Sequence, residues 1–166
     1  MDASFSLVFP GEKKQAPRLQ DVYRKAIRRV PRLNAMPPRG GVSFGSQAFR
    51  DWASDLEAGK FDDLPTDRLD YWPHYGGYLV LYYTNVFGQH FTQRALEACP
   101  DLAPVSEIRC IVEEMAKTCD FAAAGGGFDM KAERLKDRKH MEPICRLIRQ
   151  AAAFNDRVID TILRSL

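Results

Sequence analysis

An apolar face at helical spacing runs unbroken through the C-terminal end of the chain. Its members are Ile144, Ile148, Ala151, Ala152, Asn155, Val158, Ile159, Ile162 and Leu163. A helix with one apolar face is stable only when other elements cover that face. Pro143 lies near the start of this run, where a helix tolerates proline. The pattern therefore predicts a long C-terminal helix with one buried side.

Two shorter apolar faces occur in the first third of the chain. Residues 19–30 carry apolar side chains at i, i+3, i+4, i+7, i+8 and i+11, and we expect this helix to end at Pro31. Residues 49–56 carry the second face, for which Ser43 or Ser46 is the candidate N-cap. Both segments have the periodicity of amphipathic helices that pack on a common core.

Three more segments are expected to be helical. Residues 75–98 are rich in aromatic and β-branched residues, which also suits a strand, but the run is too long for one strand. Residues 105–119 carry a clear apolar face, with Asp101 as the candidate N-cap. A short helix is expected around residues 132–139.

These segments together predict an all-α fold, a single-domain bundle of five or six helices over residues 19–166. Residues 1–18 are expected to form a short extended arm or linker, in which residues 4–9 alternate like a lone strand. A length of 166 residues suits one domain with such an arm. No stretch approaches 18 uncharged apolar residues, so we expect no membrane span and no membrane among the partners.

Charge is distributed unevenly along the chain. Residues 1–50 carry ten Lys and Arg against three Asp and Glu, whereas residues 51–70 carry two against seven. The simplest interpretation is that the basic first third packs beside the acidic segment. The basic residues between 24 and 29 follow the polar face of one helix, without interleaved aromatic residues. Nucleic acid is therefore not expected among the partners.

An aromatic segment in the middle of the chain is the candidate binding surface. We assign to it Tyr71, Trp72, His74, Tyr75, Tyr78, Tyr82 and Asn85, with Tyr83 and Phe87 on a neighbouring face. Tyrosine and tryptophan carry a polar atom that needs a partner when buried, so they suit interfaces. Two interpretations remain open, namely a bulky core with a protein interface and a tyrosine-lined pocket for a small molecule.

The cysteines indicate neither a metal site nor another cofactor. Cys99, Cys110, Cys119 and Cys145 lack the close spacing of zinc ligands. The N-terminus has no secretory signal, so the cytoplasm is the expected compartment, where a free cysteine is usually a small buried residue. A thiol-dependent enzyme that pairs one cysteine with His74 or His90 is the alternative to a binding domain.

Several stretches of the chain resemble a known group of proteins. They are LVFPGEKK (7–14), VYRKAI (22–27), FGSQAFRDWASDLEAGKFD (44–62), YGGYLVLYYTNVFGQ (75–89) and GGGFDM (125–130). They are similar to the C-terminal helical region of uncharacterised bacterial proteins related to the butirosin-biosynthesis acyltransferase. In those proteins a papain-like cysteine peptidase-like domain comes first. The resemblance implies thiol chemistry in that preceding domain, and no position here matches a catalytic motif.

The leading hypothesis is therefore a helical domain that is not catalytic by itself. It binds a partner domain or a small ligand through the tyrosine-rich surface. The partner that the resemblance implies is a cysteine-peptidase-like domain, encoded upstream or in trans. A homodimer through the C-terminal helix is compatible with this hypothesis and with the thiol-enzyme alternative.

Overall fold

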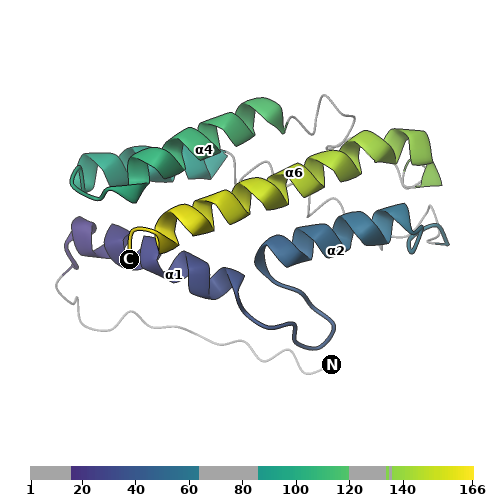
Figure 1. Cartoon of the computed structure of the whole chain (residues 1–166), viewed down its shortest axis with the longest axis horizontal. Coiled ribbons are helices and arrows are strands. Elements are labelled where there is room, and N and C mark those ends of the chain that lie inside the picture. The colour runs from purple at the N-terminus through teal and green to yellow at the C-terminus, as the bar shows by residue number, and fades with distance from the viewer. Residues whose placement is uncertain (1–15, 64–85, 120–133, 135) are drawn as a thin grey trace, which may run out of the picture.

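The computed structural model describes residues 16–63, 86–119, 134 and 136–166, and the regular elements in these ranges are helices (Figure 1). They are α1 (Leu19–Asn34), α2 (Gly45–Glu57), a helical segment over residues 86–98, α4 (Pro104–Thr118) and α6 (Arg138–Leu163). The predicted all-α bundle is confirmed. The strand-like residues 4–9 lie outside the described ranges.

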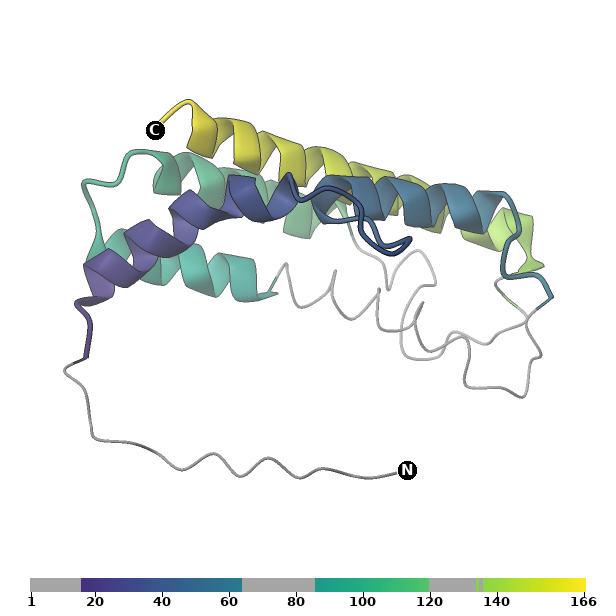
Figure 2. The same ribbon diagram turned by 90° about the horizontal axis from the view of Figure 1, so that it is seen from below.

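Helix α6 is the central element of the bundle. Figure 1 shows α4 along one side of it, and α1 and α2 end to end along the other. The view from below shows residues 86–98 beside α1 (Figure 2). The most extensive contact joins α2 to α6. The helix with the long apolar face is thus the one on which α1, α2 and α4 all pack.

The start of α6 corrects one sequence expectation. Asp137 is its N-cap and accepts hydrogen bonds from the backbone N–H groups of Lys139 and His140, at 3.0 and 3.3 Å. Of the short helix expected around residues 132–139, residues 134 and 136 are helical, whereas Arg138 and Lys139 belong to α6. Pro143 lies inside α6, close to its start, as expected.

Helix α1 continues past Pro31 to Asn34, so the predicted end was wrong. Proline removes only its own N–H from the helix, and the carbonyl of Pro31 still accepts a bond of 3.0 Å from the N–H of Ala35. The buried side of α1 is also narrower than the pattern predicted. Ile27 is buried, whereas Leu19 and Val22 are 67% and 42% exposed.

The N-terminus of α2 is capped by another helix. Neither predicted serine is the cap, because Ser43 donates its hydroxyl to Asp51 and Ser46 lies inside the helix. Instead, Oδ1 of Asn34 accepts the backbone N–H of Ser46 at 2.8 Å. Gly45 permits this approach, since a Cβ there would lie 2.8 Å from the Cα of Asn34, and its φ is +58°.

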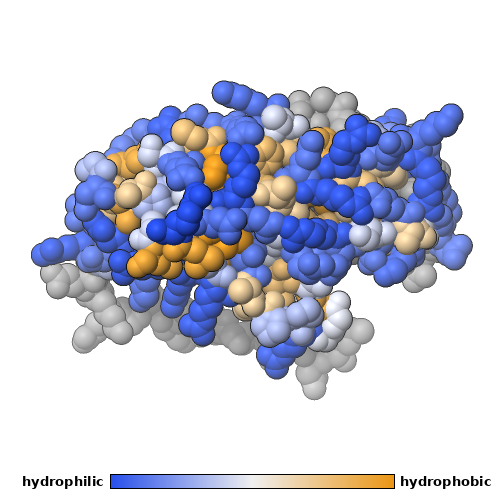
Figure 3. Space-filling model, in the orientation of Figure 1, coloured by the Kyte–Doolittle hydropathy of each residue, from blue (hydrophilic) through white to orange (hydrophobic). Residues whose placement is uncertain are grey.

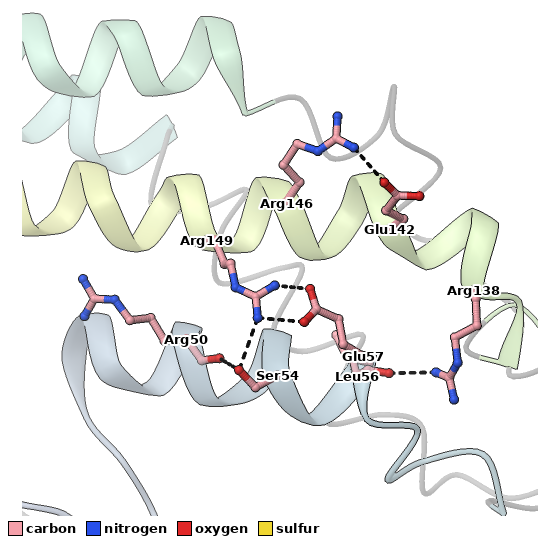
Figure 4. A network of polar contacts seen from close by, with 8 residues as sticks. All are labelled: Arg50, Ser54, Leu56, Glu57, Arg138, Glu142, Arg146 and Arg149. Carbon is pink, nitrogen blue, oxygen red and sulfur yellow. Dashed lines mark hydrogen bonds and ion pairs between the residues drawn. The ribbon is translucent and has the colours of Figure 1, made fainter.

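The acidic segment pairs with α6 and not with α1. Arg149 binds Glu57 through two nitrogens and also donates to Ser54, and Arg138 donates to the carbonyl of Leu56 at 2.9 Å (Figure 4). Arg138 also pairs with Asp62. The ion pairs of the acidic segment in the described residues therefore do not involve the basic first third, whose predicted packing beside that segment stays a prediction.

Within the described residues, α1 forms a single ion pair. Arg24 contacts Asp101 at 2.6 Å. Asp101 is not the predicted N-cap of α4, because it lies two residues before the N-cap residue, Ala103. The arginine beside it holds the pKa of the Asp101 carboxyl below its usual value, through a hydrogen bond and charge attraction.

The buried apolar residues form two clusters along α6. The larger lies between α2, α6 and the end of α4, and its members are Ala53, Leu56, Ile111, Met115, Cys119, Met141, Ile144, Cys145, Ile148, Ala151 and Phe154. The smaller lies between α1, residues 86–98, α4 and the end of α6, and its members are Ile27, Ala95, Val105, Ile108 and Ile162. We call them the α2 cluster and the α1 cluster.

Candidate functional site

The predicted aromatic surface lies outside the described residues. This holds for Tyr71, Trp72, His74, Tyr75, Tyr78, Tyr82 and Asn85, so their role stays a prediction. Of the neighbouring aromatic residues, the structure describes Phe87. It lies in the helical segment over residues 86–98 and is 62% exposed. Phe87 lines a cavity, which is a different candidate site from the predicted aromatic surface.

An apolar cavity of about 380 Å³ lies between the two clusters. Its lining comes from all five helical segments and comprises Ile27, Val30, Phe49, Phe87, Gly88, Phe91, Thr92, Val105, Ile108, Ile111, Val112, Met115, Ala151, Phe154, Asn155, Val158 and Ile162. Four of these belong to the α2 cluster and four to the α1 cluster. The cavity therefore lies at the boundary between the two clusters, where Val158 packs against both.

The cavity walls offer a ligand almost only carbon. Thr92 and Asn155 are the polar residues of the described lining. Thr92 donates its hydroxyl to the carbonyl of Gly88 at 2.8 Å. The amide nitrogen of Asn155 donates to Asn34 at 2.8 Å and to Ser46 at 2.7 Å. Since both side chains already have partners within the protein, the cavity suits an apolar ligand.

Small residues at two positions shape the cavity. Gly88 lets its helix approach α4 closely, because a Cβ there would lie 3.1 Å from Cγ1 of Val112. Ala151 lies on α6, where it is buried and lines the cavity. Among the aromatic lining residues, Phe91 also packs edge-on against Tyr23, with ring centroids 5.3 Å apart.

Sequence reasoning assigned most of these residues to the apolar faces of separate helices. It did not predict a cavity, since each face by itself looks like ordinary core. The presence of Gly88 and Ala151 among bulky residues was the available signal. That signal does not distinguish a cavity from close helix packing.

Two of the described thiols, those of Cys119 and Cys145, lie in surroundings that disfavour the thiolate. Cys99, Cys119 and Cys145 are buried, as expected, whereas Cys110 is exposed and contradicts that expectation. Burial raises the pKa of Cys145 to about 11 and also raises that of Cys119. A nucleophilic cysteine needs the opposite shift, which favours the thiolate.

Histidine support for these thiols is also missing from the described ranges. There, no hydrogen bond joins a cysteine to a histidine, and the Cys99 thiol donates instead to the carbonyl of Gln20 at 3.6 Å. His90 is exposed, and His74 lies outside the ranges. His140 has a buried Nε2 atom without a hydrogen-bond partner.

The described residues contain no group of three or more His, Cys, Asp or Glu that could hold a metal ion. None of the helices searched in them has the length and apolar character needed to cross a membrane. Comparisons with protein-family models, curated proteins and solved structures found no match. The resemblance to the helical region of cysteine-peptidase-like proteins therefore stays a prediction.

Proposed function

We propose that this chain binds an apolar small molecule in the cavity between the α1 and α2 clusters. The observation that carries the proposal is a cavity with carbon walls whose polar side chains, Thr92 and Asn155, are already hydrogen-bonded. The proposal keeps the small-ligand part of the sequence-based hypothesis. It assigns that ligand to the cavity and not to the tyrosine-rich surface.

The cavity volume favours a hydrocarbon chain or a fused-ring hydrocarbon. A cavity of about 150 Å³ holds benzene, so about 380 Å³ has room for roughly ten to fifteen carbon atoms. Burial contributes about 0.8 kcal/mol for each methylene group, before the entropic cost of association. Ten to fifteen methylene groups then contribute about 8–12 kcal/mol, and an association cost of about 4 kcal/mol leaves dissociation constants in the millimolar to micromolar range.

The test measures uptake of N-phenyl-1-naphthylamine, an uncharged aromatic probe close to the cavity in size, whose fluorescence rises and shifts to the blue in an apolar site. We expect saturable binding of one probe per chain. Ala151→Leu extends a side chain into the cavity and should weaken probe binding by tenfold or more. Ala153→Leu places the same group on the exposed face of α6, outside the cavity lining, and should bind like the wild type.

Urea unfolding of both variants accompanies the binding assay. Filling a cavity adds packing contacts, so Ala151→Leu should be folded and at least as stable as Ala153→Leu. Absence of saturable binding to the wild-type protein would overturn the proposal. If Ala151→Leu and Ala153→Leu are both folded and bind the probe equally, the probe lies outside the cavity, and this result would also overturn the proposal.

A further inference from the structure

The solvent-facing side of α1 carries a row of exposed cations, with Asp21 at its N-terminal end. Lys25, Arg28, Arg29 and Arg32 are exposed and form no ion pair in the part of the chain that the structure describes. Positively charged residues spaced three and four apart repel one another and weaken an isolated helix. A row of this kind therefore costs stability unless an anionic partner occupies it.

Aliphatic side chains lie along the flank of this basic row. Leu19, Val22 and Leu33 are 67%, 42% and 56% exposed. At 100° per residue, Val22 and Leu33 project next to Arg29, on the opposite side of the row from Arg28. Figure 3 shows apolar atoms at the surface over α1 and the C-terminal end of α6, bordered by strongly hydrophilic side chains.

The combination of cations and aliphatic residues distinguishes between anionic partners. A nucleic acid or an acidic peptide would use the arginines and lysine but has no need of exposed Leu19, Val22 and Leu33. A bilayer containing anionic lipids offers phosphate groups to the cations and an apolar boundary to the aliphatic side chains. Helices that lie on membranes have this arrangement, with a basic face beside an apolar one.

We propose that α1 binds the surface of an anionic membrane through Lys25, Arg28, Arg29 and Arg32, with Leu19, Val22 and Leu33 entering the headgroup boundary. This proposal departs from the sequence-based expectation of no membrane partner, which rested on the lack of a spanning segment, because surface binding needs no such segment. This surface goes beyond the proposed cavity function and does not depend on it. Ala151→Leu, which alters the cavity alone, should bind membranes like the wild type.

The test is co-flotation with vesicles of phosphatidylcholine that contain one third phosphatidylserine, beside vesicles of phosphatidylcholine alone. We expect the wild-type protein to float only with the first kind, and less at high salt. Arg28→Gln with Arg29→Gln should lower the partition constant by about 30-fold, from the contribution of each cation near an anionic surface. Both positions are exposed, so folding is not at risk.

The matched control is Arg94→Gln with Arg146→Gln, which removes the same charge from two exposed arginines on other helices. It should float like the wild type. Equal loss in both double variants would assign the effect to net charge and overturn the assignment to α1. Absence of wild-type flotation overturns it as well.

A third double variant separates a membrane from other anions. Val22→Ser with Leu33→Ser keeps every cation and removes the exposed aliphatic groups, so it should float several-fold less than the wild type. If this variant floats normally while the arginine variant does not, α1 recognises anions alone. That outcome overturns the membrane proposal in favour of a nucleic acid or an acidic protein.

Discussion

The two ends of α6 differ in how many side chains are buried around them and in how many stay exposed. Beside α2, the side chains of Leu56, Met141, Ile144 and Ile148 are fully buried, and arginines of α6 pair with acids at the end of α2. Beside α1, the buried cluster is smaller, and aliphatic and basic side chains of α1 face solvent. The α1 end also has fully buried residues and ion pairs, such as Arg164–Glu107, but it leaves more aliphatic and basic groups exposed than the α2 end does.

The largest test of this difference compares two truncations of buried side chains. Leu56→Ala removes a fully buried side chain from the α2 cluster and should cost about 2–5 kcal/mol of the free energy of unfolding. Ile27→Ala removes one that faces the cavity and already has fewer neighbours to lose, so its cost should fall at the lower end of that range. Urea unfolding measures both. A larger cost at Ile27 would contradict the comparison.

The next test concerns the junction between the two ends. Oδ1 of Asn34 accepts bonds from the backbone N–H of Ser46 and from the amide of Asn155. Asn34→Ala leaves both donors without this acceptor and should cost about 1–3 kcal/mol. Asn34→Asp keeps the oxygen and serves as the control near neutral pH. Equal stability of the alanine and aspartate variants in urea would show that the bonds contribute nothing.

The rate of thiol labelling measures how often local unfolding exposes the buried cysteines at each end of α6. Cys99 is buried beside α1, whereas Cys145 is buried in the α2 cluster, with its pKa raised to about 11. At pH 8 in native buffer, we expect iodoacetamide to label Cys110 first, then Cys99, and Cys145 at least tenfold more slowly than Cys99. Mass spectrometry of single-cysteine variants gives the three rates. Faster labelling of Cys145 than of Cys99 would reverse the comparison.

The smallest expected effect is the pH dependence of the Glu57–Arg149 pair. The arginine lowers the folded-state pKa of Glu57, so the pair contributes stability above the unfolded-state pKa, and the contribution is lost as pH falls through the folded-state pKa. Solvent screens this half-exposed pair, and we expect a few tenths of a kcal/mol. Glu57→Gln should therefore lose stability less steeply below pH about 4.5. Urea midpoints at several pH values measure how stability depends on pH. Equal pH dependence in the wild type and in Glu57→Gln would show that the pair contributes no stability.

The periodicity of apolar residues predicted the helices. It did not predict the N-cap of α2, the ion pairs between elements or the cavity, because these depend on contacts between helices. The apolar faces of α2, α4 and α6 depend only on residues within one helix, so periodicity identifies them. The N-cap of α2 depends on Asn34, and the contact of Asp101 depends on Arg24, both far away in the sequence. The candidate cavity depends on how five helical segments fit together, which no single segment encodes.

The hydrogen bond between Asn34 and Ser46 bears on where the chain tolerates insertion. It holds the end of α1 against the start of α2, so the ends of the loop over residues 35–44 stay together without help from the loop. Residues 35–42 are exposed, and a bridge between Arg39 and Val42 closes the tip of the loop. Lengthening a loop whose ends are already fixed costs little entropy. This loop is therefore suited to the insertion of an affinity tag, because an insertion here leaves both ends of α6 unchanged.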